Sequence, residues 1–127
     1  MATHDTLTNS FTTMIYHLAL NTEWQQNLRH ECQSLCLGPN DDLPYENLDD
    51  LKMSERTFKE ALPLNPTVPF IPCRTTGDVV FNGVKIPANT PINVLPGFTH
   101  KMEEIWTNPN NFEPDRFSEQ RGEDKKH

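Results

Sequence analysis

The distribution of proline constrains the fold of this chain more than any other feature. Most of the eleven prolines follow Asp50, whereas the part before Asp50 carries apolar residues at helical spacing. Proline has no amide hydrogen and its ring clashes with the preceding helical turn, so long helices are confined to the first half. The sequence therefore predicts a mainly α protein with a small β unit, which is an α+β arrangement.

Two helices are predicted before residue 40. The first is expected over 6–20 and, because further apolar residues lie off its stripe, should be buried on more than one side; the stripe consists of Leu7, Phe11, Ile15 and Leu18. The second is expected over 23–36; its stripe consists of Trp24, Leu28, Cys32 and Leu35. Glycine and proline at 38 and 39 end it.

A third helix and a β unit follow. Apolar spacing predicts a helix over 48–62 that is broken near Asp49 and ends abruptly at Pro63. Asn82-Gly83 lies between two β-branched runs, which is a strong signal for a hairpin with a type I′ turn. A further strand is expected at 92–94 and a short helix at 102–106. The irregular tail that follows is long for a complete compact domain.

Composition excludes several classes of function. The chain has 11 basic and 18 acidic residues and a formal net charge of -7, which argues against nucleic acid or an anionic membrane as its partner. It contains neither a run of about 20 apolar residues nor a signal peptide. Three cysteines do not form a secreted disulfide framework. A soluble, cytoplasmic protein is the simplest interpretation.

The cysteines and histidines give a weak signal for a metal. Cys32 and Cys36 are four residues apart on one predicted helix face and could share a metal ion. No further ligand pair stands at a recognised spacing, so core packing is the favoured alternative. His17, His30 and His100 are interpreted as ordinary helix or loop residues.

Four phrases in a fixed order carry a family resemblance: A-T-H-D-T at 2–6, K-E-A-L at 59–62, G-V-K-I-P-A-N-T at 83–90 and F-E-P-D-R-F at 112–117. In this order and at these distances the chain resembles the cytochrome P450 haem-thiolate monooxygenases. The resemblance implies an incomplete piece of one P450 domain, cut at both ends. It assigns 1–20 to the second half of the oxygen-activating helix, 21–37 to the next helix, 48–62 to a glutamate-bearing helix, 68–98 to the small β unit and 99–127 to the meander.

The resemblance implies catalytic roles at the start of the first helix. Asp5 and Thr6 match the acid-alcohol pair that relays protons to bound dioxygen. Ala2 and Thr3 stand where the family keeps small residues beside the haem. A hydroxyl that donates and accepts, reloaded by a carboxylate through water, suits a relay. Without the family, helix capping would be the favoured role of Asp5 and Thr6.

The substrate pocket is expected to include one segment of the chain. By resemblance, Val68, Pro69, Phe70 and Ile71 line the pocket of a small organic substrate. Plain strand packing is an equally good interpretation of these four residues when the family is left aside.

A structural network is expected around Glu60. In the family, the matching glutamate pairs with an arginine three residues on and with the arginine of the meander phrase. Glu60 and Arg116 match two members, but the third position is Pro63. Because an incomplete buried network is costly, we expect Glu60 and Arg116 to pair within about 4 Å, with reduced stability.

Two further departures concern haem. Cys73 stands where the family has an arginine for a haem propionate, and a neutral thiol cannot replace a guanidinium. Arg74 could stand in, although neighbours on a strand point to opposite faces. We expect the axial cysteine beyond His127 and no iron ligand within this chain.

The resemblance implies that the complete parent binds haem and takes electrons from a ferredoxin or a flavoprotein reductase. It would be a monooxygenase, and this chain alone would be inactive. A membrane anchor upstream in the parent is compatible with the sequence. Two alternatives stay open: a decayed, non-catalytic relative, which the replacements at Pro63 and Cys73 favour, and a small acidic α+β binding module.

Overall fold

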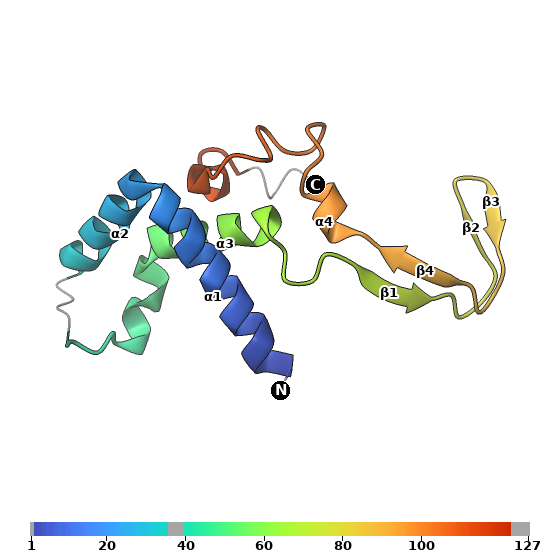
Figure 1. Cartoon of the computed structure of the whole chain (residues 1–127), viewed down its shortest axis with the longest axis horizontal. Helices are drawn as coiled ribbons and strands as arrows, with labels where there is room; N and C mark the ends of the chain where they lie inside the picture. The colour runs from blue at the N-terminus through green and yellow to red at the C-terminus, as the bar shows by residue number, and fades with distance from the viewer. Residues whose placement is uncertain (1, 36–39, 123–127) are drawn as a thin grey trace.

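A computed structural model of the chain describes residues 2–35 and 40–122, with the side chains of Ala2 and Thr3 outside the description. A helical body carries a β arm that extends away from it (Figure 1). This mainly α arrangement with a small β part confirms the predicted fold class. The elements are α1 (Ala2–Leu20), α2 (Thr22–Ser34), the 3-10 helix η1 (Tyr45–Asp50), α3 (Lys52–Leu64), β1 (Ile71–Arg74), β2 (Val79–Phe81), β3 (Val84–Ile86), β4 (Pro91–Val94), α4 (Pro96–Thr99) and η2 (Pro114–Phe117).

Helix α1 starts earlier than the predicted start at residue 6 because residues 2–5 are small or polar and add nothing to the apolar stripe. Its last turn is closed by side chains. Asn21 Nδ2 donates to the carbonyl of His17, and Gln25 Nε2 donates to that of Leu18, both at 2.7 Å. These bonds satisfy carbonyls that lose their helical partners, so α2 can begin at once.

Helix α1 packs mainly on α3, and much of its apolar stripe stays open to solvent. Phe11 meets Phe58 of α3 with ring centroids 5.4 Å apart. Leu7, Phe11 and Ile15 nevertheless stay about half or more exposed. The expected burial of α1 on several sides is therefore wrong within the described residues. No helix in the described ranges is long and apolar enough to cross a membrane.

A side chain from α2 caps α3. The N-cap position of α3 is Leu51, which has no side-chain acceptor. Glu31 supplies one from a distance: its two carboxylate oxygens accept the amides of Met53 and Ser54, and one also accepts the Ser54 hydroxyl at 2.8 Å. A negative charge at this end also complements the helix dipole. Glu31 therefore ties α2 to the first turn of α3.

Helix α3 continues through Pro63 to Leu64, so the predicted stop at Pro63 is wrong. Proline removes the hydrogen bond of its own nitrogen, but the amide of Asn65 still donates to the carbonyl of Ala61 at 3.3 Å. The helix ends because Pro66 disfavours the α conformation of the preceding Asn65, whose φ is -136°. The predicted break near Asp49 is confirmed by the separation of η1 from α3.

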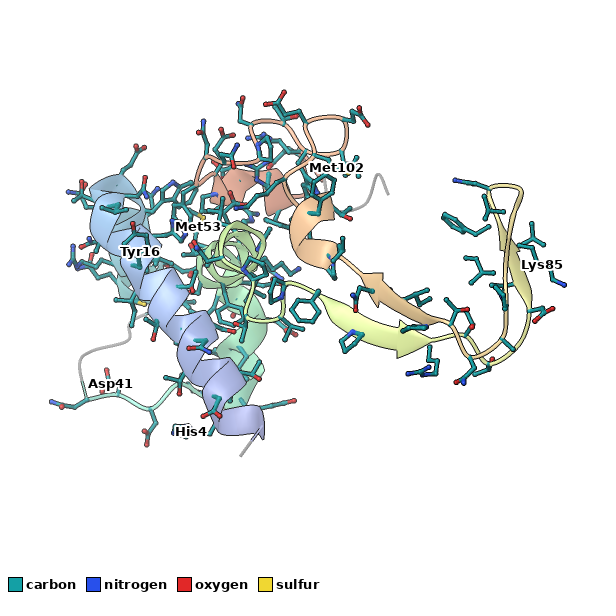
Figure 2. All side chains as sticks on the ribbon, turned by 45° about the vertical axis from the view of Figure 1, so that its right-hand side comes forward. His4, Tyr16, Asp41, Met53, Lys85 and Met102 are labelled. Atoms are coloured by element: carbon teal, nitrogen blue, oxygen red, sulfur yellow. The ribbon has the colours of Figure 1, made fainter. Side chains whose placement is uncertain are left out.

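The β arm consists of two antiparallel ribbons. Strand β1 pairs with β4, with Ile71 opposite Val94 and Cys73 opposite Ile92, and β2 pairs with β3. Asn82 and Gly83 both have positive φ, 48° and 78°, as the predicted type I′ turn requires. Lys85 on the outer hairpin lies on the far side of the molecule from His4 on α1 (Figure 2).

The predicted helix at 102–106 is wrong. That segment forms single turns in which the amides of Ile105 and Trp106 both donate to the carbonyl of Met102. The helix lies earlier, as α4, with Pro96 at its first position, where the missing amide hydrogen costs nothing.

The centre of the helical body is unusually polar. Among the described residues, the buried hydrophobic side chains other than proline are Ala61 and Leu64. The buried polar and charged residues are Ser10, Thr57, Glu60, Arg116 and Ser118. Hydrogen bonds must therefore define this core, since the apolar area that it removes from water is small.

We expect Glu31→Ala to lower the free energy of unfolding by about 1–2 kcal/mol, because two amides of α3 lose their acceptor. Urea unfolding measures this change. Glu31→Gln, which keeps one acceptor oxygen, should lose less, and Gln33→Ala on the exposed face of α2 should be close to neutral. Equal losses for Glu31→Ala and Gln33→Ala would show that the cap contributes nothing.

Candidate functional site

The predicted relay residues lie inside α1 and face solvent. Asp5 and Thr6 are exposed, and Asp5 Oδ1 lies 3.3 Å from His4 Nδ1. Because α1 begins at Ala2, neither Asp5 nor Thr6 occupies an N-cap position, which argues against the capping alternative. Ala2 and Thr3 belong to the same first turn, but their side chains are outside the described part.

A buried serine stands one turn further along α1. Ser10 is 5% exposed, and its Oγ donates to the carbonyl oxygen of Thr6 at 2.8 Å. The same Oγ lies 3.3 Å from Thr67 Oγ1, on the segment that leads into β1. This contact brings the turn that carries Asp5 and Thr6 next to the predicted pocket segment.

A cleft of about 770 Å³ opens beside this contact. Its wall is formed by α1, the end of α3, the segment before β1 and α4, and includes Asn9, Thr13, Thr67, Pro69 and Phe98. Of the four predicted pocket residues, Pro69 lines this cleft, whereas Val68, Phe70 and Ile71 present about half of their surface to solvent. Only Ile71 of these four belongs to a strand, so plain strand packing does not account for the segment.

Glu60 and Arg116 pair in the core, as the sequence predicts. Arg116 Nε donates to Glu60 Oε2 at 2.8 Å, and the two residues are 2% and 1% exposed. The other carboxylate oxygen, Glu60 Oε1, accepts the amide of Glu113 at 2.8 Å. The remaining guanidinium nitrogens donate to the carbonyls of Thr107, Asn108 and Asn111. Each partner thus has several hydrogen bonds, as a buried ion pair requires.

Two carboxyl groups of this network shift in opposite directions. Burial raises the pKa of Glu60, although the bonds from Glu113 and Arg116 oppose the rise. At Glu113 burial also acts to raise the pKa, but the hydrogen bonds from Arg121 and Asn108 outweigh it and lower the pKa from its ordinary value of 4.5. The outer carboxylate therefore stabilises the fold in its ionised form.

Pro63 borders the network without disrupting it. A cavity of only about 10 Å³ separates Pro63 from His100 and Trp106. Burial lowers the pKa of His100, which favours the neutral ring. Glu60 is satisfied without an arginine at position 63, because one carboxylate oxygen accepts the amide of Glu113 and the other accepts Arg116 Nε. The expected reduction in stability stays a prediction.

Arg74 is engaged elsewhere. Its Nη1 donates to the backbone carbonyl of Asn89 at 2.8 Å and approaches Asn89 Oδ1 at 3.4 Å. Strand β1 runs away from the helical body (Figure 1), and Cys73 and Arg74 belong to its second half. The structure does not bring Arg74 together with Asp5 and Thr6.

The described residues contain no group of three or more histidine, cysteine, aspartate and glutamate side chains that could hold a metal ion. Cys32 is a free, half-buried thiol on α2 and Cys73 is a free, exposed one on β1. Cys36 lies outside the described residues, so a metal shared by Cys32 and Cys36 stays untested.

Sequence reasoning missed several contacts around the cleft and the Glu60–Arg116 ion pair. Ser10 and Thr67 gave no signal because their contact joins positions 57 residues apart. His17 was interpreted as an ordinary histidine, yet its Nε2 bonds to Asn65 Oδ1 at 2.9 Å and its ring stacks on Phe112. Glu113 stands in the meander phrase, which was the one available hint.

Comparisons with known proteins agree with this geometry. The family model for cytochrome P450 matches residues 1–127. Putative cytochrome P450 136 of Mycobacterium tuberculosis is 39% identical over all of this chain and 25% of that protein. Cytochrome P450 4d10 of Drosophila mettleri is 34% identical over 90% of this chain and 22% of that protein. The chain thus spans about a quarter of the length of the curated relatives that it matches.

A pig protein and a solved structure extend the comparison. Taurochenodeoxycholic 6 alpha-hydroxylase of Sus scrofa is 32% identical over 92% of this chain and 23% of that protein. A structure of a zebra fish cytochrome P450 with progesterone superposes with a TM-score of 0.83 at 22% identity, covering 90% of this chain and 27% of that one. At that identity the superposition shows the shared fold.

Replacing Glu60 should be the costliest change in the core. We expect Glu60→Gln to lower the free energy of unfolding by about 3 kcal/mol or more, because Arg116 stays buried without a charged partner. Glu55→Gln is the matched control, since Glu55 forms an exposed pair with Lys59 at 2.8 Å and should contribute below about 0.5 kcal/mol. Urea unfolding of both variants gives the comparison, and similar losses would contradict a central role for Glu60.

The lowered pKa of Glu113 predicts a pH dependence. A carboxyl group whose pKa is lower in the folded state stabilises above its ordinary value, and this stability is lost as the pH falls through the folded value. We expect Glu113→Gln to have a lower free energy of unfolding than the unchanged protein at about pH 6. This difference should shrink as the pH is lowered to about pH 3, because the unchanged protein then loses the contribution of the ionised Glu113. Urea unfolding across that range measures the difference, and a constant deficit would refute the assignment.

Proposed function

The chain belongs to the cytochrome P450 family, and from this membership we propose that it forms part of a haem-dependent monooxygenase that inserts one oxygen atom of dioxygen into a small organic substrate. The observation that supports this proposal most is the position of Asp5 and Thr6. They lie on a solvent-open turn of α1 that Ser10 links to Thr67, the residue just before the segment 68–71.

The described residues fit haem on one side. The side chains of Val68, Phe70 and Ile71 are about half exposed, and they present apolar surface of the kind that a flat apolar group would cover. When bound, haem supplies the activation of dioxygen. Arg74 uses Nη1 on Asn89 and keeps its other donors, so it stays the proposed partner of a propionate. We assign haem no axial ligand among the described residues.

In this proposal Asp5 and Thr6 handle protons. The Thr6 hydroxyl can donate one proton while accepting another, and the Asp5 carboxylate can resupply it through a water molecule. Solvent exposure of the Asp5 side chain favours this, since a relay needs a path from bulk water. Ala2 and Thr3 precede these residues on the same helix and would border the oxygen site.

The substrate would meet the segment Val68, Pro69, Phe70 and Ile71, whose exposed apolar groups favour an organic molecule with an apolar surface. Electrons would come from a ferredoxin or a flavoprotein reductase, as the family membership implies. Free thiols at Cys32 and Cys73 favour a reducing compartment such as the cytoplasm.

The relay is tested by Asp5→Asn and Thr6→Val in the haem-loaded parent protein with its electron donor. We expect the yield of oxygenated product per electron to fall about 100-fold, the usual effect of losing acid-base assistance. Thr8→Val, an exposed change on the same helix, is the control. Undiminished yield in both relay variants would rule out these roles.

A non-catalytic relative is the second candidate. Cys73 supports it, because this exposed thiol stands in the sequence where the family resemblance expects an arginine. The same experiment separates the two proposals. A non-catalytic parent would bind haem weakly or give no product, and Asp5→Asn would then change nothing.

A further inference from the structure

Ser10 holds an unusual position for a helix residue. It is one of the few buried polar residues of the body, at 5% exposure, while its neighbours Asn9 and Phe11 are exposed. Its Oγ bonds at 2.8 Å to the carbonyl of Thr6, four residues earlier. An α-helix pairs this same carbonyl with the amide of residue 10, so the hydroxyl competes for it. Such bonds bend helices locally.

The direction of the second hydrogen bond follows from the first. A serine hydroxyl has one hydrogen, and Ser10 uses it on the Thr6 carbonyl. In the 3.3 Å contact between Ser10 Oγ and Thr67 Oγ1, Thr67 must therefore be the donor. The chain of bonds runs from Thr67 to Ser10 and on to the backbone of Thr6.

Thr67 is itself held in place. It directly follows Pro66, whose ring restricts the backbone. Two residues after Thr67, the carbonyl of Pro69 accepts a hydrogen bond from the amide of Gly97 on α4 at 3.2 Å. The donor to Ser10 therefore sits on a segment that is tied at both ends, and a displacement of this segment would reach the turn at Thr6.

We propose that Ser10 and Thr67 are positioning residues, which fix the turn that carries Asp5 and Thr6 relative to the pocket segment that begins at Val68. This inference rests on the proposed function of those residues. The hydroxyl pair, with Ser10 buried and Thr67 half-buried, would keep the relay turn in one conformation, so that a proton is delivered at a fixed distance from the substrate rather than over a range of distances.

The test uses variants matched in shape in the parent protein. Thr67→Val keeps the shape and removes the donor, Ser10→Ala removes the acceptor, and Thr67→Ser keeps the donor. Thr76→Val, in the exposed turn after β1, is the control. The first readout is amide hydrogen exchange of the peptide covering residues 6–10. We expect about 5- to 10-fold faster exchange in Thr67→Val and Ser10→Ala, and less than about twofold change in Thr67→Ser and Thr76→Val.

The second readout is the fraction of electrons released as hydrogen peroxide instead of product by the haem-loaded parent. It should rise several-fold in Thr67→Val and return to the original value in Thr67→Ser, with thermal stability similar in both. Unchanged exchange in Thr67→Val would overturn the proposed coupling. Faster exchange without any rise in peroxide, in a protein whose relay variants do lose product, would overturn the positioning role.

A failure of the proposed proton relay can be distinguished from a failure of the positioning role. It would appear as undiminished product in Asp5→Asn and Thr6→Val. The exchange measurement needs neither haem nor substrate, so it reports on the Ser10–Thr67 contact whichever way that result falls.

Discussion

The helical body depends on the ion pair between Glu60 and Arg116. Its two partners are 56 positions apart in sequence and almost completely buried, in a centre that offers few apolar side chains. Because a guanidinium has five donors in a fixed plane, Arg116 can hold one carboxylate and three backbone carbonyls together. The segment from Thr107 to Ser118 has little regular structure, and Arg116 binds three of its backbone carbonyls to the core. Glu113 and Arg121 then close the outer side of the segment at 3.0 Å.

Local patterns in the sequence predicted the elements whose conformation depends on neighbouring residues. The hairpin at Asn82-Gly83 follows from two residues that tolerate positive φ, and α1 follows from its apolar stripe. The predicted end of α3 at Pro63 was wrong because Pro66 ends this helix, and the two prolines act in different ways. A proline inside the last turn removes one bond, whereas a proline after the helix excludes its neighbour from the α region.

What the sequence could not predict is contact between distant segments. The pairing of Glu60 with Arg116 was accessible because both stand in family phrases, but the carbonyl partners of Arg116 were not, since backbone atoms leave no mark in a sequence. Glu31 as the cap of another helix, and Thr67 as the donor to Ser10, likewise depend on how the elements meet. The family match over the whole chain also answers the alternative of an unrelated acidic module.

Gly97 adds a constraint of a different kind. A Cβ atom there would lie 3.2 Å from Pro66 Cγ and 3.2 Å from the Pro69 carbonyl oxygen, closer than ordinary packing allows. Helix α4 and the 66–69 segment therefore touch backbone to backbone at one rim of the cleft. A rim of this kind cannot open by rotating a side chain, and its width changes only if whole segments move. The wall formed by α1, by contrast, carries side chains such as Asn9 and Thr13 that can change rotamer.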